Sequence, residues 1–305
     1  MSRLSKEQNL YAGVCAGELL PLELLFSRQS APELAQLDVV EYRRGGAGPV
    51  RHRAAAAASR AARAGKARGA SLPLYVPGWG NSPSDEAARE LVAALLRHHP
   101  AVLVLDTRRA FARGYLSAAA RVSAVSRQLF RLVESLQAAG VPPAELHVIG
   151  FSLGAHVAGL AGRLVRRRLR AELGRITALD PARPCFARAE LRLRRSDAAF
   201  VQVIHSSAGV LGLAEPLGHA DVYVNGVEGR QPECGPEQGG VECDHNAAWR
   251  VFAASARAAG GMRARRCAGW DELRAGACAG PPAQLGYPAS TAARGMFLYK
   301  TRPGS

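Results

Sequence analysis

The segment Gly150-Phe-Ser-Leu-Gly154 places a serine two residues from a glycine on each side. This G-x-S-x-G spacing permits a sharp strand-to-helix turn that exposes the serine hydroxyl for nucleophilic attack. An apolar run, Leu146–Ile149, comes directly before the motif, and apolar residues at helical spacing follow it. We therefore predict that Ser152 is the nucleophile of an acyl-transfer reaction; the alternative is a serine in an ordinary strand-to-helix turn.

A serine hydroxyl is a weak nucleophile and needs a base, which a third group must orient. Asp180 follows the apolar run Ile176–Leu179 and precedes Pro181. That position, at the carboxyl end of a strand, suits an orienting carboxylate, since the order serine, acid, histidine is typical of folds with this turn. The alternative is an aspartate that only starts a turn before proline.

Three histidines follow Asp180 and are candidates for the base, and residue types alone do not choose among them. His205 ends an apolar strand. His219 lies in a Gly-His-Ala-Asp turn, where a structural hydrogen bond is expected. His245 follows Cys243 by two residues and precedes a stretch with helical spacing of apolar side chains.

The elements that must position these residues form an alternating pattern. Residues 72–180 switch between short apolar runs and amphipathic stretches, which is typical of βαβ units and a mostly parallel sheet flanked by helices. Strands are expected at 72–76, 101–105, 146–149, 176–179 and 200–204. Helices are expected after a start signal at Ser82, Pro83 and Asp85, from Val122 to Leu136 with a stop at Gly140, and from Val157 to Leu164.

The length of 305 residues and the 48% apolar composition fit one compact α/β domain. Residues 1–71 are expected to contribute N-terminal strands and a basic connection to that domain, and residues 72–303 to form its catalytic part. The stretch 51–70 is nearly all Ala, Arg and Gly without apolar periodicity, so we expect an irregular surface connection there.

The formal net charge of +15 raises nucleic acid or an anionic membrane as a partner. Only three lysines are present, and the arginines are scattered through an Ala- and Gly-rich chain, which compositional drift explains as well as selected binding does. No helix-turn-helix, zinc-finger or RRM-type signature is present, so we predict no nucleic-acid partner. No apolar run reaches the roughly 18 residues of a membrane span, so we predict no transmembrane segment.

Six cysteines form an even set, of which the last four make two close pairs. Eight and ten residues separate the partners, too many for a zinc knuckle, so we expect disulfides, no metal and an oxidising compartment. The start of the chain, Met1 to Gln8, is polar and is not a signal peptide. We therefore expect an extracellular protein whose natural leader is absent from this sequence.

Five segments together resemble the pancreatic-lipase-like lipases, and among them the arthropod neutral lipases and phospholipases A1, over roughly residues 72–303. They are Leu146-His-Val-Ile-Gly-Phe-Ser-Leu-Gly-Ala-His-Val-Ala-Gly159, Ala178-Leu-Asp-Pro-Ala-Arg-Pro184, Val203-Ile-His205, Gly218-His-Ala-Asp-Val-Tyr-Val-Asn-Gly226 and Cys243-Asp-His245. The resemblance implies an α/β-hydrolase fold in a single domain, without the C-terminal β-sandwich of the vertebrate pancreatic lipases.

For the site, the resemblance implies a triad of Ser152, Asp180 and His245 and an oxyanion hole made by the backbone N–H groups of Leu153 and Trp79. It also implies disulfides Cys234–Cys243 and Cys267–Cys278. Cys15 and Cys185 remain as a candidate third pair. Two positions depart from the family: Pro77 replaces a histidine in the oxyanion loop, and Thr107 replaces a tryptophan that usually follows the aspartate at 106.

For function, the resemblance implies hydrolysis of lipid carboxylic esters, glycerides or phospholipids, at a lipid–water interface and without a cofactor. The alternatives are an idle lipid-binding or yolk-type carrier and an esterase for small soluble esters. In the family a lid lies between the two cysteines that precede the base. Here only the eight residues from Gly235 to Glu242 separate them, too few and too polar for an amphipathic capping helix. The loop between His205 and Gly218 is also short, so we expect an open rim that favours phospholipase A1-like or broad esterase action.

Overall fold

The computed structural model describes residues 37–65, 71–235, 237 and 239–301. Their centre is an eleven-stranded sheet in the order β10-β9-β11-β8-β7-β6-β5-β3-β4-β1-β2. The strands are β1 (Asp38–Arg43), β2 (Val50–Arg53), β3 (Leu72–Val76), β4 (Ala101–Leu105), β5 (Leu146–Phe151), β6 (Arg175–Leu179), β7 (Phe200–His205), β8 (Ala220–Val224), β9 (Met262–Arg266), β10 (Pro282–Leu285) and β11 (Gly295–Tyr299).

The seven strands from β4 to β11 in the middle of this order run parallel, and the outer strands pair antiparallel. The central strands β3 to β8 are buried along nearly their whole length, because helices cover both faces. This is the predicted α/β arrangement. All five expected strands are present, and β5 continues to the residue before Ser152.

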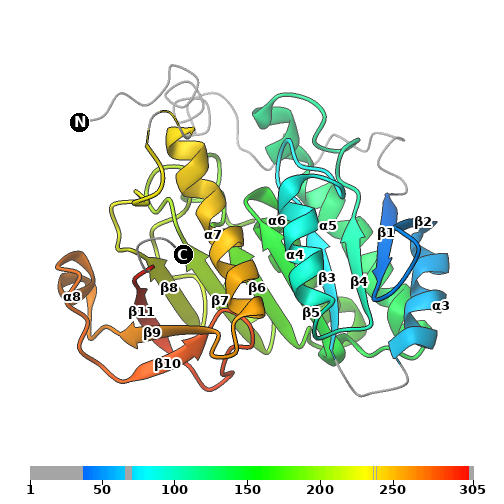
Figure 1. The fold of residues 1–305 in the computed structure, drawn as a ribbon. Helices are drawn as coiled ribbons and strands as arrows, with labels where there is room; N and C mark the ends of the chain where they lie inside the picture. Colours follow the sequence, from blue (N-terminus) through cyan, green and yellow to red (C-terminus); the bar gives the residue numbers. More distant parts are fainter. Residues whose placement is uncertain (1–36, 66–70, 236, 238, 302–305) are drawn as a thin grey trace.

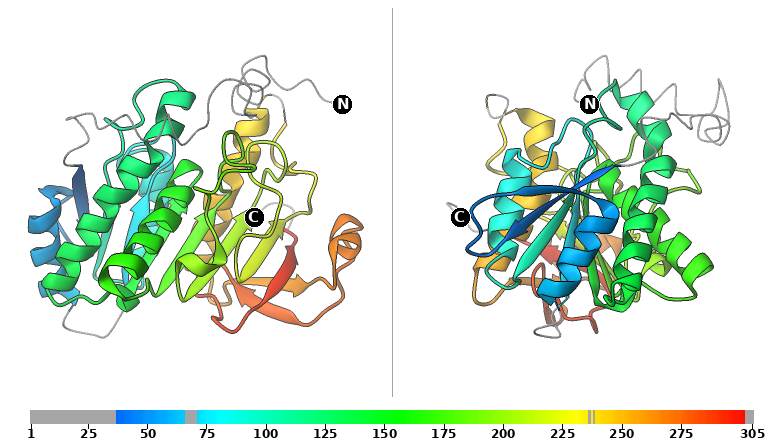
Figure 2. Two further views of the ribbon diagram at one scale, coloured as in Figure 1. Left: turned by 180° about the vertical axis from the view of Figure 1, so that it is seen from behind. Right: turned by 90° about the vertical axis from the view of Figure 1, so that its right-hand side faces the viewer.

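Helices cover both faces of the sheet (Figures 1 and 2). One face carries α3 (Ala54–Gly65), α5 (Tyr115–Ala138) and α6 (Leu153–Leu169); the other carries α4 (Glu86–Leu95) and α7 (Gly240–Arg257). Short helices η2 (Pro143–Glu145), η3 (Arg195–Asp197) and α8 (Trp270–Arg274) lie in the connections. Among the described residues, no helix is both long and apolar enough to cross a membrane.

The segment 51–70 is not the irregular connection that its composition suggested. Residues 50–53 form β2 against β1, and residues 54–65 form α3. Alanine has the highest intrinsic helix propensity, so an Ala-rich run forms a helix without a broad apolar stripe. Ala57 and Ala58 are buried and pack in the same core as α5. Residues 66–70 lie outside the described part.

The predicted start of the helix after β3 was three residues early. Asp85, not Ser82, is the N-cap: its carboxylate accepts the N–H of Ala88 at 2.8 Å and that of Ser82 at 2.9 Å. The same carboxylate therefore closes the preceding turn and caps the helix. The predicted stop at Gly140 is present, and that residue has a positive φ of 91°.

Small residues let α6 approach its neighbours. A Cβ at Gly154 would lie 2.1 Å from the carbonyl oxygen of Val76 in β3. A Cβ at Gly162 would lie 2.0 Å from the carbonyl oxygen of Asp197 in η3. The first contact brings α6 against the sheet, whereas the second brings η3 against the outer surface of the helix.

We predict that Gly162→Ala destabilises the protein although alanine is the better helix former by about 1 kcal/mol. The methyl group would overlap the backbone of Asp197, and such overpacking costs about 1–3 kcal/mol. Urea unfolding under non-reducing conditions should show a lower midpoint. The exposed substitution Gln137→Ala in α5 should change stability by less than about 0.5 kcal/mol. An unchanged or higher midpoint for Gly162→Ala would contradict the close contact.

Candidate active site

Ser152 lies at the sharp turn between β5 and α6. Its φ of 56° and ψ of −119° fall in a region that side-chain-bearing residues rarely adopt. A Cβ at Gly150 would lie 2.4 Å from the carbonyl oxygen of Gly154, so the two arms of the turn touch where the motif has its glycines. The strain of roughly 1–3 kcal/mol persists because the buried strand and helix fix both sides.

Asp180 is the first residue after the neighbouring strand β6, as Ser152 is the first residue after β5. Phe151 of β5 pairs with Leu179 of β6, so Ser152 and Asp180 follow adjacent strands at the same edge of the sheet. The carboxylate of Asp180 is fully buried. It accepts the N–H groups of Ser206 at 2.8 Å and Ser207 at 3.1 Å, and also the Ser207 hydroxyl.

These donors set the charge of the acid. Burial by itself raises the pKa of Asp180, but the hydrogen bond and charge of His245, the Ser207 hydroxyl and the Ser206 amide outweigh it. The pKa of Asp180 therefore lies below its usual value, and the carboxylate is ionised at neutral pH. A side chain at Gly212 would have its Cβ 2.4 Å from Asp180 Oδ1, so glycine is needed there as well.

His245 donates from Nδ1 to Asp180 Oδ2 at 2.6 Å. Its ring lies 4.7 Å, centroid to centroid, from the ring of Phe151, the residue before the serine. With Nδ1–H donated to the acid, Nε2 is left as the basic nitrogen, as a general base for a serine requires. His245 lies inside α7 rather than before a helix, because α7 already begins at Gly240, after the left-handed Gly239.

The other two candidate histidines have structural partners. His205 is fully buried: Nδ1 lies 2.8 Å from the carbonyl oxygen of Leu213, and Nε2 lies 3.0 Å from Asp221 Oδ1. His219 accepts the N–H of Val201 at Nδ1, at 3.0 Å, which is the kind of role expected from its turn. The structure therefore places one of the three histidines, His245, against Asp180.

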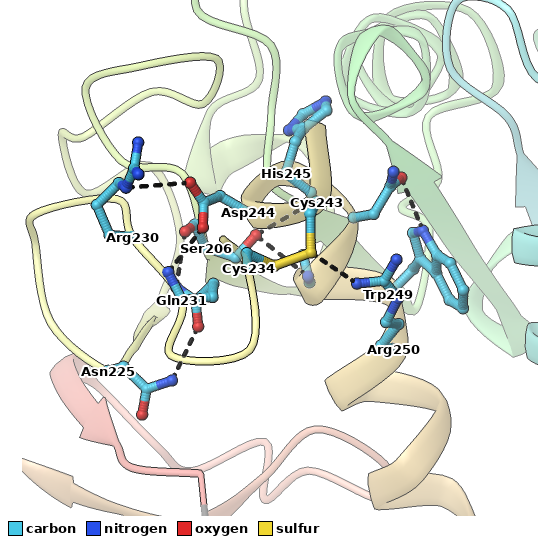
Figure 3. Close-up of a disulfide and its surroundings, with 12 residues drawn as sticks. Ser206, Asn225, Arg230, Gln231, Cys234, Cys243, Asp244, His245, Trp249 and Arg250 are labelled. Atoms are coloured by element: carbon cyan, nitrogen blue, oxygen red, sulfur yellow. Dashed lines mark hydrogen bonds and ion pairs between the residues drawn. A yellow bond between two sulfur atoms is a disulfide. The ribbon is translucent and has the colours of Figure 1, made fainter. Parts of the chain in front are cut away.

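Residues without a role in the sequence analysis support the backbone on either side of His245 (Figure 3). Ser206 Oγ donates to the carbonyl oxygen of His245 at 3.2 Å. Gln231 is only 4% exposed; its Nε2 donates to the carbonyl oxygen of Ser206 at 2.8 Å, and its N–H donates to Asp244 Oδ1 at 2.7 Å. Ser206 and Ser207 follow a strand at the same sheet edge as Asp180, which was a usable signal, whereas nothing in the sequence singles out Gln231.

His156 lies four residues after the serine, in the first turns of α6. Its Nε2 donates to the carbonyl oxygen of Ala182 at 2.8 Å, and its Nδ1 accepts the N–H of Leu193 at 3.2 Å. Burial lowers the pKa of His156 to about 4, so the ring is neutral and serves both bonds. It thereby holds the segment that follows Asp180 against α6.

Both predicted disulfides are formed. Cys234–Cys243 has a Cα–Cα distance of 5.5 Å and ties the loop after β8 to α7, two residues before His245 (Figure 3). Cys267–Cys278 has a Cα–Cα distance of 4.5 Å. Cys185 is also disulfide-bonded, and Cys15 lies outside the described residues.

Of the two residues named for the oxyanion hole, Leu153 directly follows the serine, and Trp79 lies on a loop that contacts it. A Cβ at Gly78 would lie 2.9 Å from the Cβ of Ser152, so the loop that carries Trp79 packs directly on the turn. Within the described chain, neither Trp79 N–H nor Leu153 N–H donates to an acceptor. The loop also lies against α6 at Pro77, whose carbonyl oxygen would lie 2.9 Å from a Cβ at Gly154.

Thr107, the second position that departs from the family, lies on the loop after β4, and this loop contacts Trp79. Thr107 is buried, and its carbonyl oxygen accepts the N–H of Phe111 at 2.8 Å. The indole N–H of Trp79 donates to the carbonyl oxygen of Arg113 at 2.9 Å, and the ring makes an edge contact with Tyr115. The tryptophan side chain is 42% exposed at the rim of the site.

The described residues between Cys234 and Cys243 are exposed or half-buried. Glu237 and Glu242 are solvent-exposed and Val241 is half-buried. Residues 240–242 already belong to the first turn of α7. Positions 236 and 238 lie outside the described residues.

A strained serine on a strand-to-helix turn, a buried acid on the next parallel strand and a histidine bound to that acid define the α/β-hydrolase class. Residues 50–295 match the family model described as Lipase. The chain therefore belongs to the pancreatic-lipase family.

Several relatives support this membership. Phospholipase A1 member A of Rattus norvegicus is 36% identical over 196 residues, which is 62% of this chain and 42% of that protein. Lipase member H of Rattus norvegicus is 38% identical over 171 residues, 54% of this chain and 37% of the relative. The chain thus matches about two fifths of the length of these relatives.

Similarity to solved structures is weaker. A hyperthermophilic esterase from the archaeon Pyrobaculum calidifontis is 16% identical, with a TM-score of 0.28 over 60% of each chain. A likeness at this level carries no argument about activity.

We predict that Ser152→Ala, Asp180→Asn and His245→Ala each lower ester hydrolysis by roughly 10⁴-fold or more, and that the losses do not add, because a triad acts as a unit. Steady-state rates of the single and double variants test this. The control is His98→Ala, which changes an exposed histidine bonded to the carbonyl oxygen of Ala256 and should leave the rate unchanged. A folded His245→Ala variant with full activity would assign the base elsewhere.

Proposed function

We propose that this protein hydrolyses lipid carboxylic esters through an acyl-enzyme on Ser152. The observation that carries the proposal is the 2.6 Å contact between His245 Nδ1 and the buried Asp180, beside a serine in a strained turn. Membership of the lipase family and similarity to a phospholipase A1 support ester hydrolysis as the reaction.

The mechanism follows from these groups. His245 Nε2 takes the proton of Ser152 as its oxygen attacks the ester carbonyl, and the protonated ring then gives that proton to the departing alcohol. Water, activated by the same nitrogen, releases the acid and restores the serine. Asp180 stays ionised, fixes the tautomer of His245 and stabilises the charged ring.

The developing oxyanion is assigned to the free backbone N–H groups of Leu153 and Trp79. Donors fixed at such a charge contribute about 3–4 kcal/mol each to the transition state. Gly78 supports this assignment, because its lack of a side chain allows the loop to lie against Ser152. None of these steps needs a metal or an organic cofactor.

We propose phospholipids, cleaved as by a phospholipase A1, or a broad range of esters as substrates, in preference to strict triglyceride hydrolysis. The short, polar segment between Cys234 and Cys243 supports an open rim that accepts charged headgroups. An extracellular location is proposed because the disulfides need an oxidising compartment.

The main alternative is a lipase-like carrier that binds lipid without cleaving it, and a fluorophosphonate probe separates the two. We expect the probe to label Ser152, and Ser152→Ala to abolish labelling. Wild-type protein should also release fatty acid from a panel of phospholipid, triglyceride and short-chain ester. A folded wild-type protein that does not label and releases no acid would contradict hydrolysis and favour the carrier.

The open rim predicts a second kinetic property. Specific activity on a short-chain ester should rise smoothly as the substrate passes its solubility limit, because no lid has to open. Initial rates measured across that limit test this. A sharp increase at the limit would contradict the lidless arrangement, and fast cleavage of long-chain triglycerides with no phospholipid cleavage would contradict the substrate preference.

A further inference from the structure

A hollow of about 380 Å³ lies away from the triad, on the side of the sheet that α6 covers. Its lining comes from residues 188–190 and 192–195, which end at the first residue of η3, and from Pro216 and Leu217, just before β8. The lining has one acidic residue, Glu190, and four positive charges, which come from Arg188, Arg192, Arg194 and Arg195. We call these four side chains the arginine pocket.

The positive charges of the arginine pocket are uncompensated. Within the described chain, none of its four guanidinium groups forms an ion pair, and neither does Glu190. Asp197, in η3 beside the pocket, is buried and engaged: it binds Arg163 Nε at 2.9 Å and the backbone N–H of Arg194 at 2.8 Å. It therefore cannot turn outward to neutralise the pocket.

In a second hollow of the protein, arginines form ion pairs with aspartates. It measures about 490 Å³ and is lined by Arg51, Arg108 and Arg109 together with Asp38 and Asp106. Arg108 binds Asp106 at 2.8 Å, and Arg51 binds both aspartates. Burial raises the pKa of Asp106, but these arginines outweigh it and lower the pKa to about 2. Two of the three arginines of this hollow are therefore paired with aspartates. In the arginine pocket the one carboxylate of the lining, Glu190, forms no ion pair with the four arginines within the described residues.

The backbone around the arginine pocket is held in place. Arg192 Nη1 donates to the carbonyl oxygen of Ala187 at 2.6 Å, and Arg194 Nη2 donates to that of Glu190 at 3.0 Å. Arg163 Nη1, reaching from α6, donates to the same Glu190 oxygen at 2.9 Å. Two arginines are therefore oriented by neutral carbonyl groups and keep their full charge and further N–H donors for a ligand.

We propose that the arginine pocket binds a tetrahedral oxyanion, a phosphate or sulfate group. Guanidinium groups match the oxygen pairs of such anions with paired N–H donors, and their bonds to charged acceptors are the strong ones. The site is independent of ester hydrolysis. One wall of the pocket continues the segment that follows Asp180, and the other continues the segment that follows β7. These two segments are already joined by hydrogen bonds: Leu213 N–H donates to the carbonyl oxygen of Pro181 at 2.9 Å, and Arg183 N–H donates to that of Leu211 at 2.7 Å. A bound anion bridges these segments a second time.

The test compares calorimetric titrations with inorganic phosphate at constant ionic strength. Wild-type protein should bind phosphate with a saturable heat, and the double variant Arg192→Gln/Arg195→Gln should weaken binding by about tenfold or more, since charge-assisted bonds are lost. The control Arg167→Gln/Arg168→Gln removes the same charge from exposed positions of α6 outside the pocket and should change affinity less than about twofold.

Hydrogen exchange of the wild-type protein locates the site without relying on a variant. Phosphate should slow amide exchange in segments 188–195 and 211–217, and chloride at the same ionic strength should not. Equal weakening in both double variants, or no slowing at these segments, would overturn the proposal.

The phosphate group could also belong to a lipid, and vesicles distinguish that source. Phosphatidylcholine vesicles with and without phosphatidic acid are sedimented with each protein. If binding to phosphatidic acid falls in the pocket variant but not in the control variant, the pocket takes a lipid headgroup. If the pocket variant loses only inorganic phosphate, it takes the free anion. Either result supports an oxyanion site, and indistinguishable variants in both assays would overturn it.

Discussion

The buried carboxylate of Asp180 is the group around which the site is organised. An ionised carboxylate out of contact with water is costly unless donors surround it. Here the donors come from two different parts of the chain, the segment after β7 and α7. Satisfying one charge therefore fixes the end of β7 and the position of α7 at the same time, and with them the ring of His245.

The strained turn at Ser152 is a second constraint that depends on close packing. Gly150, Gly154 and Gly78 each face an atom that a methyl group would overlap. The glycines allow strand, helix and oxyanion loop to meet around one side chain, and the buried core beneath them keeps that arrangement. The hydrogen bonds to Asp180 thus position His245, whereas close packing of the glycines positions Ser152.

The central part of the fold could be predicted from the sequence because its strands are continuous apolar runs and its helices have a clear apolar stripe, as from Val122 to Leu136. The helix α3 could not, since alanines such as Ala57 are small enough to pack without producing a stripe. The choice of His245 over His205 also lay beyond the residue pattern. Both histidines lie beside a carboxylate, and only the crossing of α7 over the sheet edge decides which one meets Asp180. Gln231 was missed for a related reason, because its bond to Ser206 joins residues that are 25 positions apart in the sequence.

The exposure of Trp79 has a spectroscopic consequence. Of the three tryptophans, Trp249 is buried and Trp270 is half-buried, whereas Trp79 presents its indole to solvent. Because the backbone of Trp79 lies on the loop packed against Ser152, its ring marks the rim of the site. Indole emission shifts to shorter wavelength when water leaves the ring, so the intrinsic fluorescence of this protein contains a reporter for whatever covers that rim, with no label to introduce.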